Sequence, residues 1–151
     1  MLGAGPAAGW AQMQAPAVTS THRHIYPEVA EGEHDVLAAI AQARTEHKRV
    51  LIVFGGDWCG DCQVLDINLH DAANAELVAK SFVVVHVNIG RMDQNVELAH
   101  RYGVPLQRGV PAISVVSGTG KVVYAQAEGE FESMRSMDPR SVTEFLNKWK
   151  G

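Results

Sequence analysis

The chain has 151 residues, a formal net charge of −4 and 46% hydrophobic residues. This length and composition are typical of one globular domain with a substantial core. The sequence has no block of basic residues and no apolar stretch long enough to span a bilayer, so we expect neither nucleic acid as a partner nor a membrane span.

The first part of the chain differs from the rest, because residues 1–21 contain no charged side chain and are rich in Ala, Gly, Pro and Gln. A segment of this kind buries too little apolar surface to order itself. We expect residues 1–30 to be a disordered tail or the remnant of a secretion signal, and residues 31–151 to be one folded domain. A signal would make the protein periplasmic or otherwise exported, whereas a plain tail would leave it cytoplasmic.

Apolar periodicity predicts alternating helices and strands over the domain. The first helix, residues 34–47, has an expected apolar stripe that includes Leu37. Asn74 and Asp93 are expected N-caps of two later helices. The β-branched run at residues 82–89 predicts a central strand. The expected strands are residues 50–54, 82–89, 112–116 and 122–125, and the expected helices begin near residues 34, 59, 74, 93 and 139. Together these elements predict an α/β fold with a central mixed sheet flanked by helices.

Cys59 and Cys62 are the two cysteines of the chain, and they follow the predicted strand at residues 50–54. A helix that begins here offers unpaired N–H groups and partial positive charge, which favour a thiolate. The spacer of Gly60 and Asp61 lets the second sulfur reach the first once a helical turn forms. One thiol can therefore attack a disulfide and the other can resolve the product, with Cys59 at the helix start as the attacking thiol.

Two other interpretations of the pair remain open at this stage. Cys-x-x-Cys is half of a zinc site, so the protein could be a metal-binding carrier that uses Cys59, Cys62 and a histidine. A purely structural disulfide is the third possibility, although so short a loop constrains the unfolded chain little. We favour redox chemistry by the two thiols themselves, without a cofactor or a metal.

Three motifs carry a resemblance to a known family: Trp58-Cys59-Gly60-Asp61-Cys62, Asn88-Ile89-Gly90-Arg91 and Val110-Pro111. With the order of elements, they resemble the thioredoxin fold over roughly residues 36–149, and more narrowly bacterial thioredoxin-like proteins of the thiol–disulfide interchange type. The resemblance implies that the domain at residues 31–151 is thioredoxin-like. The resemblance implies that Cys59 is the nucleophile, Cys62 the resolving thiol and Pro111 a cis-proline facing the pair. Val110 would then present its backbone to a substrate strand, and Trp58 would either pack or belong to the docking surface.

The chain departs from thioredoxin at the positions that serve its buried proton relay. Val53 stands where the family carries a buried acid, and His86 stands on the strand that carries its buried lysine. The remaining candidates for a base are Asp57, Asp61 and His86. We expect both acids to be solvated, and His86 to be a core or edge histidine held by hydrogen bonds.

The charges around the pair bear on the direction of the chemistry. Asp57 and Asp61 lie close to Cys59, and no Lys, Arg or His occurs from residue 57 to residue 62. Negative charge disfavours a thiolate, which makes a disulfide less oxidising. We therefore expect a thiol–disulfide oxidoreductase that leans towards reductase or isomerase behaviour, acts as a monomer on disulfide-containing proteins, and is recycled by a redox partner that the sequence does not identify.

Overall fold

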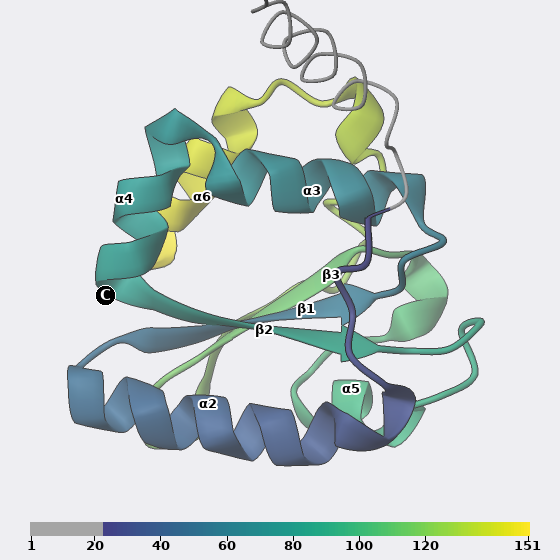
Figure 1. The fold of residues 1–151 in the computed structure, drawn as a ribbon, viewed down its shortest axis with the longest axis horizontal. Coiled ribbons are helices and arrows are strands. Elements are labelled where there is room, and N and C mark those ends of the chain that lie inside the picture. The colour runs from purple at the N-terminus through teal and green to yellow at the C-terminus, as the bar shows by residue number, and fades with distance from the viewer. Residues whose placement is uncertain (1–22) are drawn as a thin grey trace, which may run out of the picture.

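The computed structural model describes residues 23–151, which form a four-stranded sheet with helices on both faces (Figure 1). The strands are β1 (Arg49–Gly55), β2 (Phe82–Asn88), β3 (Ala112–Val116) and β4 (Val122–Ala125). The helices are α2 (Gly32–Glu46), α3 (Gly60–His70), α4 (Ala72–Ser81), α5 (Val96–Arg101) and α6 (Arg140–Trp149). Short 3-10 turns are η2 (Val29–Glu31), η3 (Leu106–Arg108) and η4 (Met134–Ser136).

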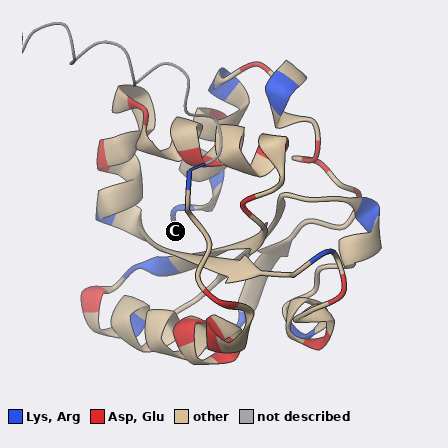
Figure 2. Ribbon diagram, turned by 45° about the vertical axis from the view of Figure 1, so that its right-hand side comes forward, with Lys and Arg blue, Asp and Glu red and all other residues tan. Residues whose placement is uncertain are grey.

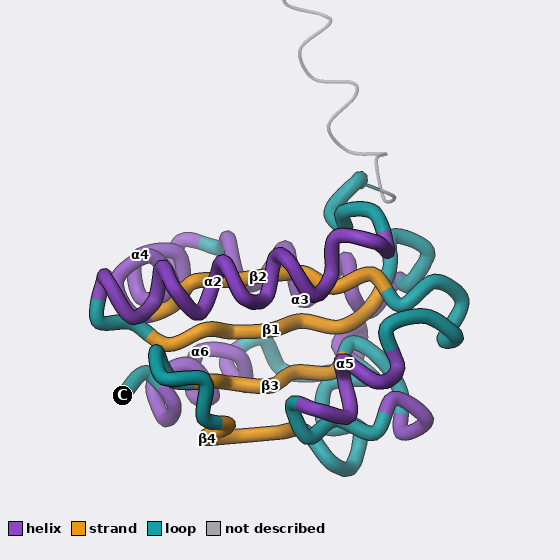
Figure 3. The backbone as a smooth tube through the Cα atoms, turned by 90° about the horizontal axis from the view of Figure 1, so that it is seen from below, coloured by secondary structure: helices purple, strands orange, loops and turns teal. Residues whose placement is uncertain are grey.

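The strands lie in the order β2-β1-β3-β4, as Figure 3 shows. β1 runs parallel to β2 and antiparallel to β3, and β3 runs antiparallel to β4. The predicted mixed sheet flanked by helices is confirmed. The expectation of a central strand at residues 82–89 is wrong, since β2 is an edge strand. Its β-branched residues still suit the position, because helices α2 and α4 pack against it.

Two apolar layers hold the helices to the sheet. α2 and α5 cover one face, and α3, α4 and α6 cover the other (Figure 1). The central strand β1 supplies both layers by alternation: Ile52 and Phe54 point to the first, and Leu51 and Val53 to the second. β1 is therefore fixed from both sides, and its carboxyl end is a rigid base for the residues that follow.

Three local predictions fail, and each failure has a physical reason. Leu37 is 55% exposed, because the buried stripe of α2 runs through Ala39 instead. Asn74 lies inside α4, buried, where its side-chain amide donates to the Asn68 carbonyl, and the cap position falls on Asp71. At α5 the cap position is Asn95 rather than Asp93, whose carboxylate accepts instead from the Arg91 backbone N–H.

The domain begins earlier than the expected boundary at residue 31. Residues 23–27, which we call the strap, run between the two helical layers past the end of the sheet (purple in Figure 1). Tyr26 in the strap is 1% exposed, and the Pro27 carbonyl accepts a hydrogen bond from the Asn88 side chain. The expected tail or secretion signal otherwise falls on residues 1–22, outside the described residues.

Acidic side chains gather where the chain enters α2 (Figure 2), with Glu31, Glu33 and Asp35 in or just before its first turn. Carboxylates are favourable there because they face the positive end of the helix dipole. In residues 23–151, no helix combines the length and the apolar character needed to cross a membrane.

Candidate active site

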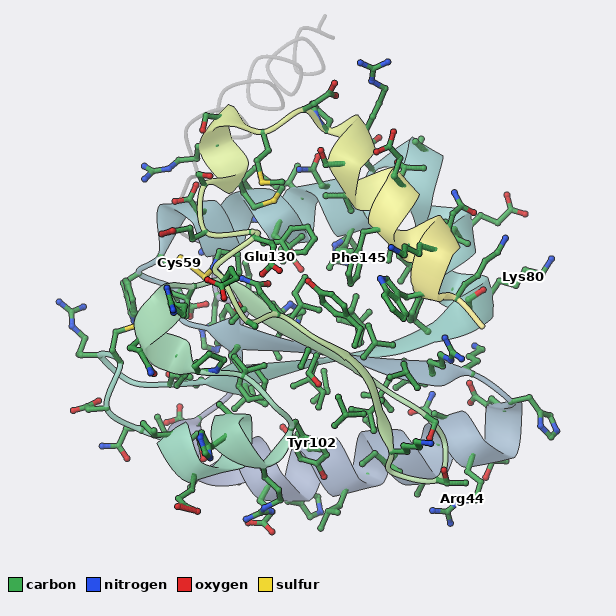
Figure 4. All side chains as sticks on the ribbon, turned by 180° about the vertical axis from the view of Figure 1, so that it is seen from behind. Arg44, Cys59, Lys80, Tyr102, Glu130 and Phe145 are labelled. Carbon is green, nitrogen blue, oxygen red and sulfur yellow. A yellow bond between two sulfur atoms is a disulfide. The ribbon has the colours of Figure 1, made fainter. Side chains whose placement is uncertain are left out.

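The two cysteines lie where the chain passes from the carboxyl end of β1 into α3. Cys59 is the N-cap of α3, and its Sγ accepts the backbone N–H of Cys62 at 3.1 Å. The two residues form a disulfide with their Cα atoms 5.2 Å apart. Both are buried, Cys62 more deeply than Cys59, so the Cys59 sulfur is the outer one. Figure 4 shows Cys59 at the end of the molecule opposite Lys80.

A second loop, before β3, lies against the outer sulfur. The Val110–Pro111 peptide bond is cis, and the Val110 carbonyl oxygen lies 3.8 Å from Cys59 Sγ. The buried Gln126 side chain holds this loop, since its Nε2 donates to the Pro111 carbonyl and its Oε1 accepts from the Ile113 N–H. The structure therefore brings Val110 and Pro111 to the cysteine pair.

Trp58 forms part of the rim beside the pair and is 40% exposed. Its indole Nε1 donates to the Gly90 carbonyl at 2.7 Å, and the Arg91 guanidinium lies 5.5 Å from the ring centroid. The residues Gly90 and Arg91 follow β2, so the indole ties the loop that carries the cysteines to the next loop along the sheet edge. The Trp58 side chain is therefore packed against the neighbouring loop and also partly exposed to solvent.

We expected Asp57 to be solvated, but its carboxylate instead holds the strap in place. Its carboxylate accepts the backbone N–H groups of Ile25 and Tyr26 at 2.8 and 2.9 Å, and its second oxygen lies 2.8 Å from His24 Nδ1. Burial raises the pKa of Asp57, but the hydrogen bonds from these three residues outweigh burial and hold the pKa below its usual value. Asp57 therefore stays ionised and keeps the strap in place.

Asp61 is likewise paired rather than solvated. Its carboxylate accepts from the backbone N–H of Arg135 at 2.8 Å and from its Nε at 3.1 Å. The guanidinium also flanks Gly60, where an added Cβ would lie 3.2 Å from Arg135 Nη1. The positive charge of Arg135, in η4, therefore lies beside Asp61, although the two residues are 74 apart in the chain. No basic residue close to Asp61 in the sequence compensates its charge.

His86 is half-buried on the edge strand β2, next to Val53 in the β1–β2 register. Its ring meets the edge of Tyr26 with centroids 5.0 Å apart, and its Nε2 lies 3.4 Å from Asp66 Oδ1. In this chain, Val53 therefore occupies the position of the family's buried acid, and His86 beside it occupies that of the buried lysine. The histidine packs against the Tyr26 ring and lies within ion-pair distance of Asp66, but its Nε2 has no hydrogen-bond partner among residues 23–151, so the hydrogen bonds that we expected to hold it are not found there.

Asp66 is a buried carboxylate that our sequence analysis missed. It lies one turn after Cys62 on α3, and it accepts from Arg23 Nη2 at 2.8 Å. Burial raises the pKa of Asp66, but His86, His70 and Arg23 outweigh burial and hold the pKa below its usual value. Its spacing of four residues from Cys62, on the same helix face, was a usable signal; Tyr26 and Arg135 offered none.

The metal-carrier alternative finds no support in the described part of the chain. Within residues 23–151, the group of potential ligands that lie close enough to share an ion is Glu31, His34 and Asp35, and it includes neither cysteine. The pair is disulfide-bonded instead. What the site can do is exchange thiols for a disulfide.

A mixed sheet whose central strand delivers a Cys-x-x-Cys disulfide to a helix N-terminus, with a proline loop against the outer sulfur, defines a thioredoxin-fold dithiol protein. Residues 32–118 match the family model described as thioredoxin-like. The chain belongs to this thioredoxin-like family.

Three relatives show how far the similarity extends. The crystal structure of a disulphide isomerase from Xylella fastidiosa Temecula1 is 39% identical, with a TM-score of 0.80, over 85% of this chain and 98% of that one. A thioredoxin from Thermus thermophilus has the same fold, with 24% identity and a TM-score of 0.55 over 84% of this chain and 86% of that one. A protein disulfide-isomerase from Datisca glomerata is 26% identical over 87% of this chain, which spans only 25% of that relative's length.

Proposed function

We propose that the protein is a thiol–disulfide oxidoreductase that acts on protein disulfides as a reductase or isomerase, without a cofactor. The Cys59–Cys62 disulfide at the N-terminus of α3 is the observation that carries this proposal. Two thiols at this spacing pass two electrons to another disulfide as they close. The chain has no further cysteine, so this pair alone carries the electrons.

Cys59 is the proposed nucleophile, because its sulfur is the outer one and accepts an N–H at the helix start. That position favours the thiolate. The thiolate attacks one sulfur of a substrate disulfide, so that a bond from Cys59 Sγ to that sulfur forms while the substrate disulfide breaks. The second substrate sulfur leaves as a thiolate and takes up a proton.

Cys62 is the proposed resolving thiol. It gives up its proton and attacks Cys59 Sγ, which forms the intramolecular disulfide and releases the first substrate sulfur in reduced form. The protein is then oxidised, and a separate dithiol partner must return two electrons and two protons. If the freed substrate thiolate attacks the mixed disulfide instead, the substrate is isomerised without net electron transfer.

The docking surface is proposed to consist of Trp58, Val110 and Pro111. The Val110 carbonyl faces the outer sulfur at 3.8 Å, where the backbone of an extended substrate segment can pair with it. The half-exposed indole of Trp58 supplies aromatic surface beside it. The relative from Xylella fastidiosa, described as a disulphide isomerase, supports a protein substrate.

We also propose that the protein is an exported, periplasmic monomer. Ala15-Pro16-Ala17, which loosely resembles the cleavage site of a secretion signal, supports export, and the stable protein disulfides on which such an enzyme would act occur chiefly in oxidising compartments. Cell fractionation and size-exclusion chromatography test the two proposals. Recovery in the cytoplasm, or elution as an oligomer, would contradict the corresponding one.

The roles of the cysteines are tested by single substitutions in a disulfide-reduction assay on a model protein. Cys59→Ser should abolish reduction, because no thiolate attacks the substrate. Cys62→Ser should leave the attack intact but accumulate mixed disulfides, because release needs the second thiol. Accumulation by Cys59→Ser and not by Cys62→Ser would reverse the two roles, and full activity of either variant would end the proposal.

A further inference from the structure

Tyr26 is the most deeply buried polar side chain near the cysteines, and the mechanism above does not use it. The residue is 1% exposed, and its hydroxyl has no hydrogen-bond partner among residues 23–151. Burying a hydroxyl without a partner costs free energy. A buried hydroxyl without a partner calls for an explanation, and a role in redox chemistry is one that its place beside the cysteines suggests.

The hydroxyl faces the inner sulfur across a glycine. An ideal Cβ on Gly55 would lie 2.5 Å from Cys62 Sγ and 2.6 Å from Tyr26 Oη, so these two atoms flank the same point. Because Gly55 has no side chain, nothing from β1 separates the oxygen from the sulfur. Tyr26 packs in one buried cluster with Cys59 and Cys62.

The tyrosine is held in this position from its other sides. Asp57 accepts its backbone N–H at 2.9 Å, and His86 packs against its ring with 5.0 Å between the centroids. Burial raises the pKa of Tyr26 far above its ordinary value, and the charges of Asp66 and Asp57 raise it further. The hydroxyl therefore keeps its proton and can act only as a donor or as a neutral acceptor, never as a base at neutral pH.

We propose that the Tyr26 hydroxyl donates a hydrogen bond to Cys62 Sγ when the disulfide is reduced, and that it thereby stabilises the reduced form of the protein. This inference rests on the proposed redox cycle of the pair. In the disulfide, Cys62 Sγ is bonded to Cys59 Sγ and is a weak acceptor; after reduction that bond is gone, and the sulfur becomes a strong, charged acceptor when Cys62 gives up its proton to act as the resolving thiolate. The donor is thus unused in the oxidised form and used in the reduced form.

The consequence is a shift in the redox equilibrium. Reduction of the pair by glutathione breaks the Cys59–Cys62 bond, consumes two glutathione thiols and yields two protein thiols and one glutathione disulfide. Any interaction present only in the reduced protein favours this direction. Tyr26 therefore makes the disulfide of this protein more oxidising than it would be with an apolar ring at the same place.

Tyr26→Phe tests the proposal, because it removes the hydroxyl and keeps the ring. We expect the equilibrium constant with glutathione to move about tenfold towards the oxidised protein, which corresponds to roughly 30 mV for a two-electron couple. In urea unfolding, the reduced form should lose stability, while the oxidised form should be unchanged or more stable. Tyr124→Phe, on β4 in a different cluster, is the matched control and should leave the glutathione equilibrium in place.

A merely structural tyrosine would destabilise both redox forms equally and leave the glutathione equilibrium where it is; that result overturns the inference. A wild-type protein that does not exchange with glutathione at all would instead overturn the proposed function. If Tyr26→Phe does not fold, the wild type still decides the matter. The chain has three tyrosines, so isotope-labelled tyrosine gives three resolvable NMR signals from the hydroxyl-bearing carbon. The Tyr26 signal should move on reduction while the others stay; an unmoved Tyr26 signal contradicts the hydrogen bond.

Discussion

The two sulfurs of the disulfide face unlike environments. Cys59 lies at the rim, where the charges of Asp61 and Arg135 are paired and the Arg135 side chain is 69% exposed. Cys62 faces the interior, where Tyr26 and its neighbours are almost removed from solvent. Because water and salt screen charges at the rim far more than in the interior, a polar contact behind Cys62 has a larger effect than one in front of Cys59.

The two sides also act in opposite directions. Acidic groups at the rim disfavour a thiolate, and Arg135 reduces that effect by pairing with Asp61. The buried hydroxyl of Tyr26 favours the reduced form instead. The reduction potential of the pair is therefore set by two opposing contributions: solvent-screened charges in front of Cys59 and a buried hydroxyl behind Cys62. It is not a property of the four residues from Cys59 to Cys62 alone.

If the inner side is tightly packed, one methyl group added there should cost far more than one added at the rim. Gly55→Ala places a Cβ 2.5 Å from Cys62 Sγ and 2.6 Å from Tyr26 Oη. We expect a loss of about 3 kcal/mol in the free energy of unfolding, the upper range for overpacking a core. Gly60→Ala is the control: its closest neighbour is the flexible end of Arg135, so it should stay within about 0.5 kcal/mol of the wild type.

Urea unfolding of the oxidised proteins measures both values. Equal losses for Gly55→Ala and Gly60→Ala would show that the interior yields as easily as the rim, and the contrast between the two sides would disappear.

Asp66→Asn should produce the next largest effect, because it leaves Arg23 and His86 facing a neutral amide in a buried site. We expect a loss of about 2 kcal/mol at neutral pH. The pKa of Asp66 is lowered in the folded protein. Its charge therefore stabilises the fold above the unfolded carboxyl pKa of about 3.9, and this contribution is lost as pH falls through the folded pKa.

The difference between wild type and Asp66→Asn should accordingly shrink as the pH of the urea titration is lowered below about 4. The Asp66→Asn variant should still lose some stability in acid, because it keeps Asp57, whose pKa is also lowered. A difference that does not change between neutral and acidic pH would mean that the carboxylate charge of Asp66 does not stabilise the fold.

The smallest effects are expected from the pair at the rim. Asp61→Asn should make the disulfide more oxidising, and Arg135→Gln should make it less oxidising, each by about two- to threefold in the glutathione equilibrium, the scale of exposed ion pairs. Both changes should fade as salt is raised, since the Debye length shortens. A change of tenfold or more, insensitive to salt, would place the dominant electrostatic control in front of Cys59 rather than behind Cys62.

Much of the fold follows from local sequence. The hairpin of β3 and β4 and the buried strand β1 were predictable because β-branched runs and turn residues lie next to each other in the chain. The cysteine pair and its position at a helix start were predictable for the same reason. The edge position of β2 was not, because a run of β-branched residues suits any strand that helices cover on both faces.

The surroundings of the pair depend on contacts between distant segments. Asp61 meets Arg135 across 74 residues, and Asp57 meets the backbone of Ile25 across 32. No local pattern indicates such contacts, so both acids looked solvated. Tyr26 lies in a segment without apolar periodicity, and its burial follows only from the hydrogen bonds that fasten the strap.

The strap also shows that the residues that match the family model and the residues that set the reduction potential of the disulfide lie in different parts of this chain. The match to the thioredoxin-like family model begins at residue 32 and ends at residue 118. Tyr26 precedes that span and Arg135 follows it, although one lies behind the disulfide and the other in front of it. Two proteins with the same matched core can therefore differ in reduction potential through their flanking segments alone. Grafting those segments from one protein onto the other is then a way to transfer the reduction potential.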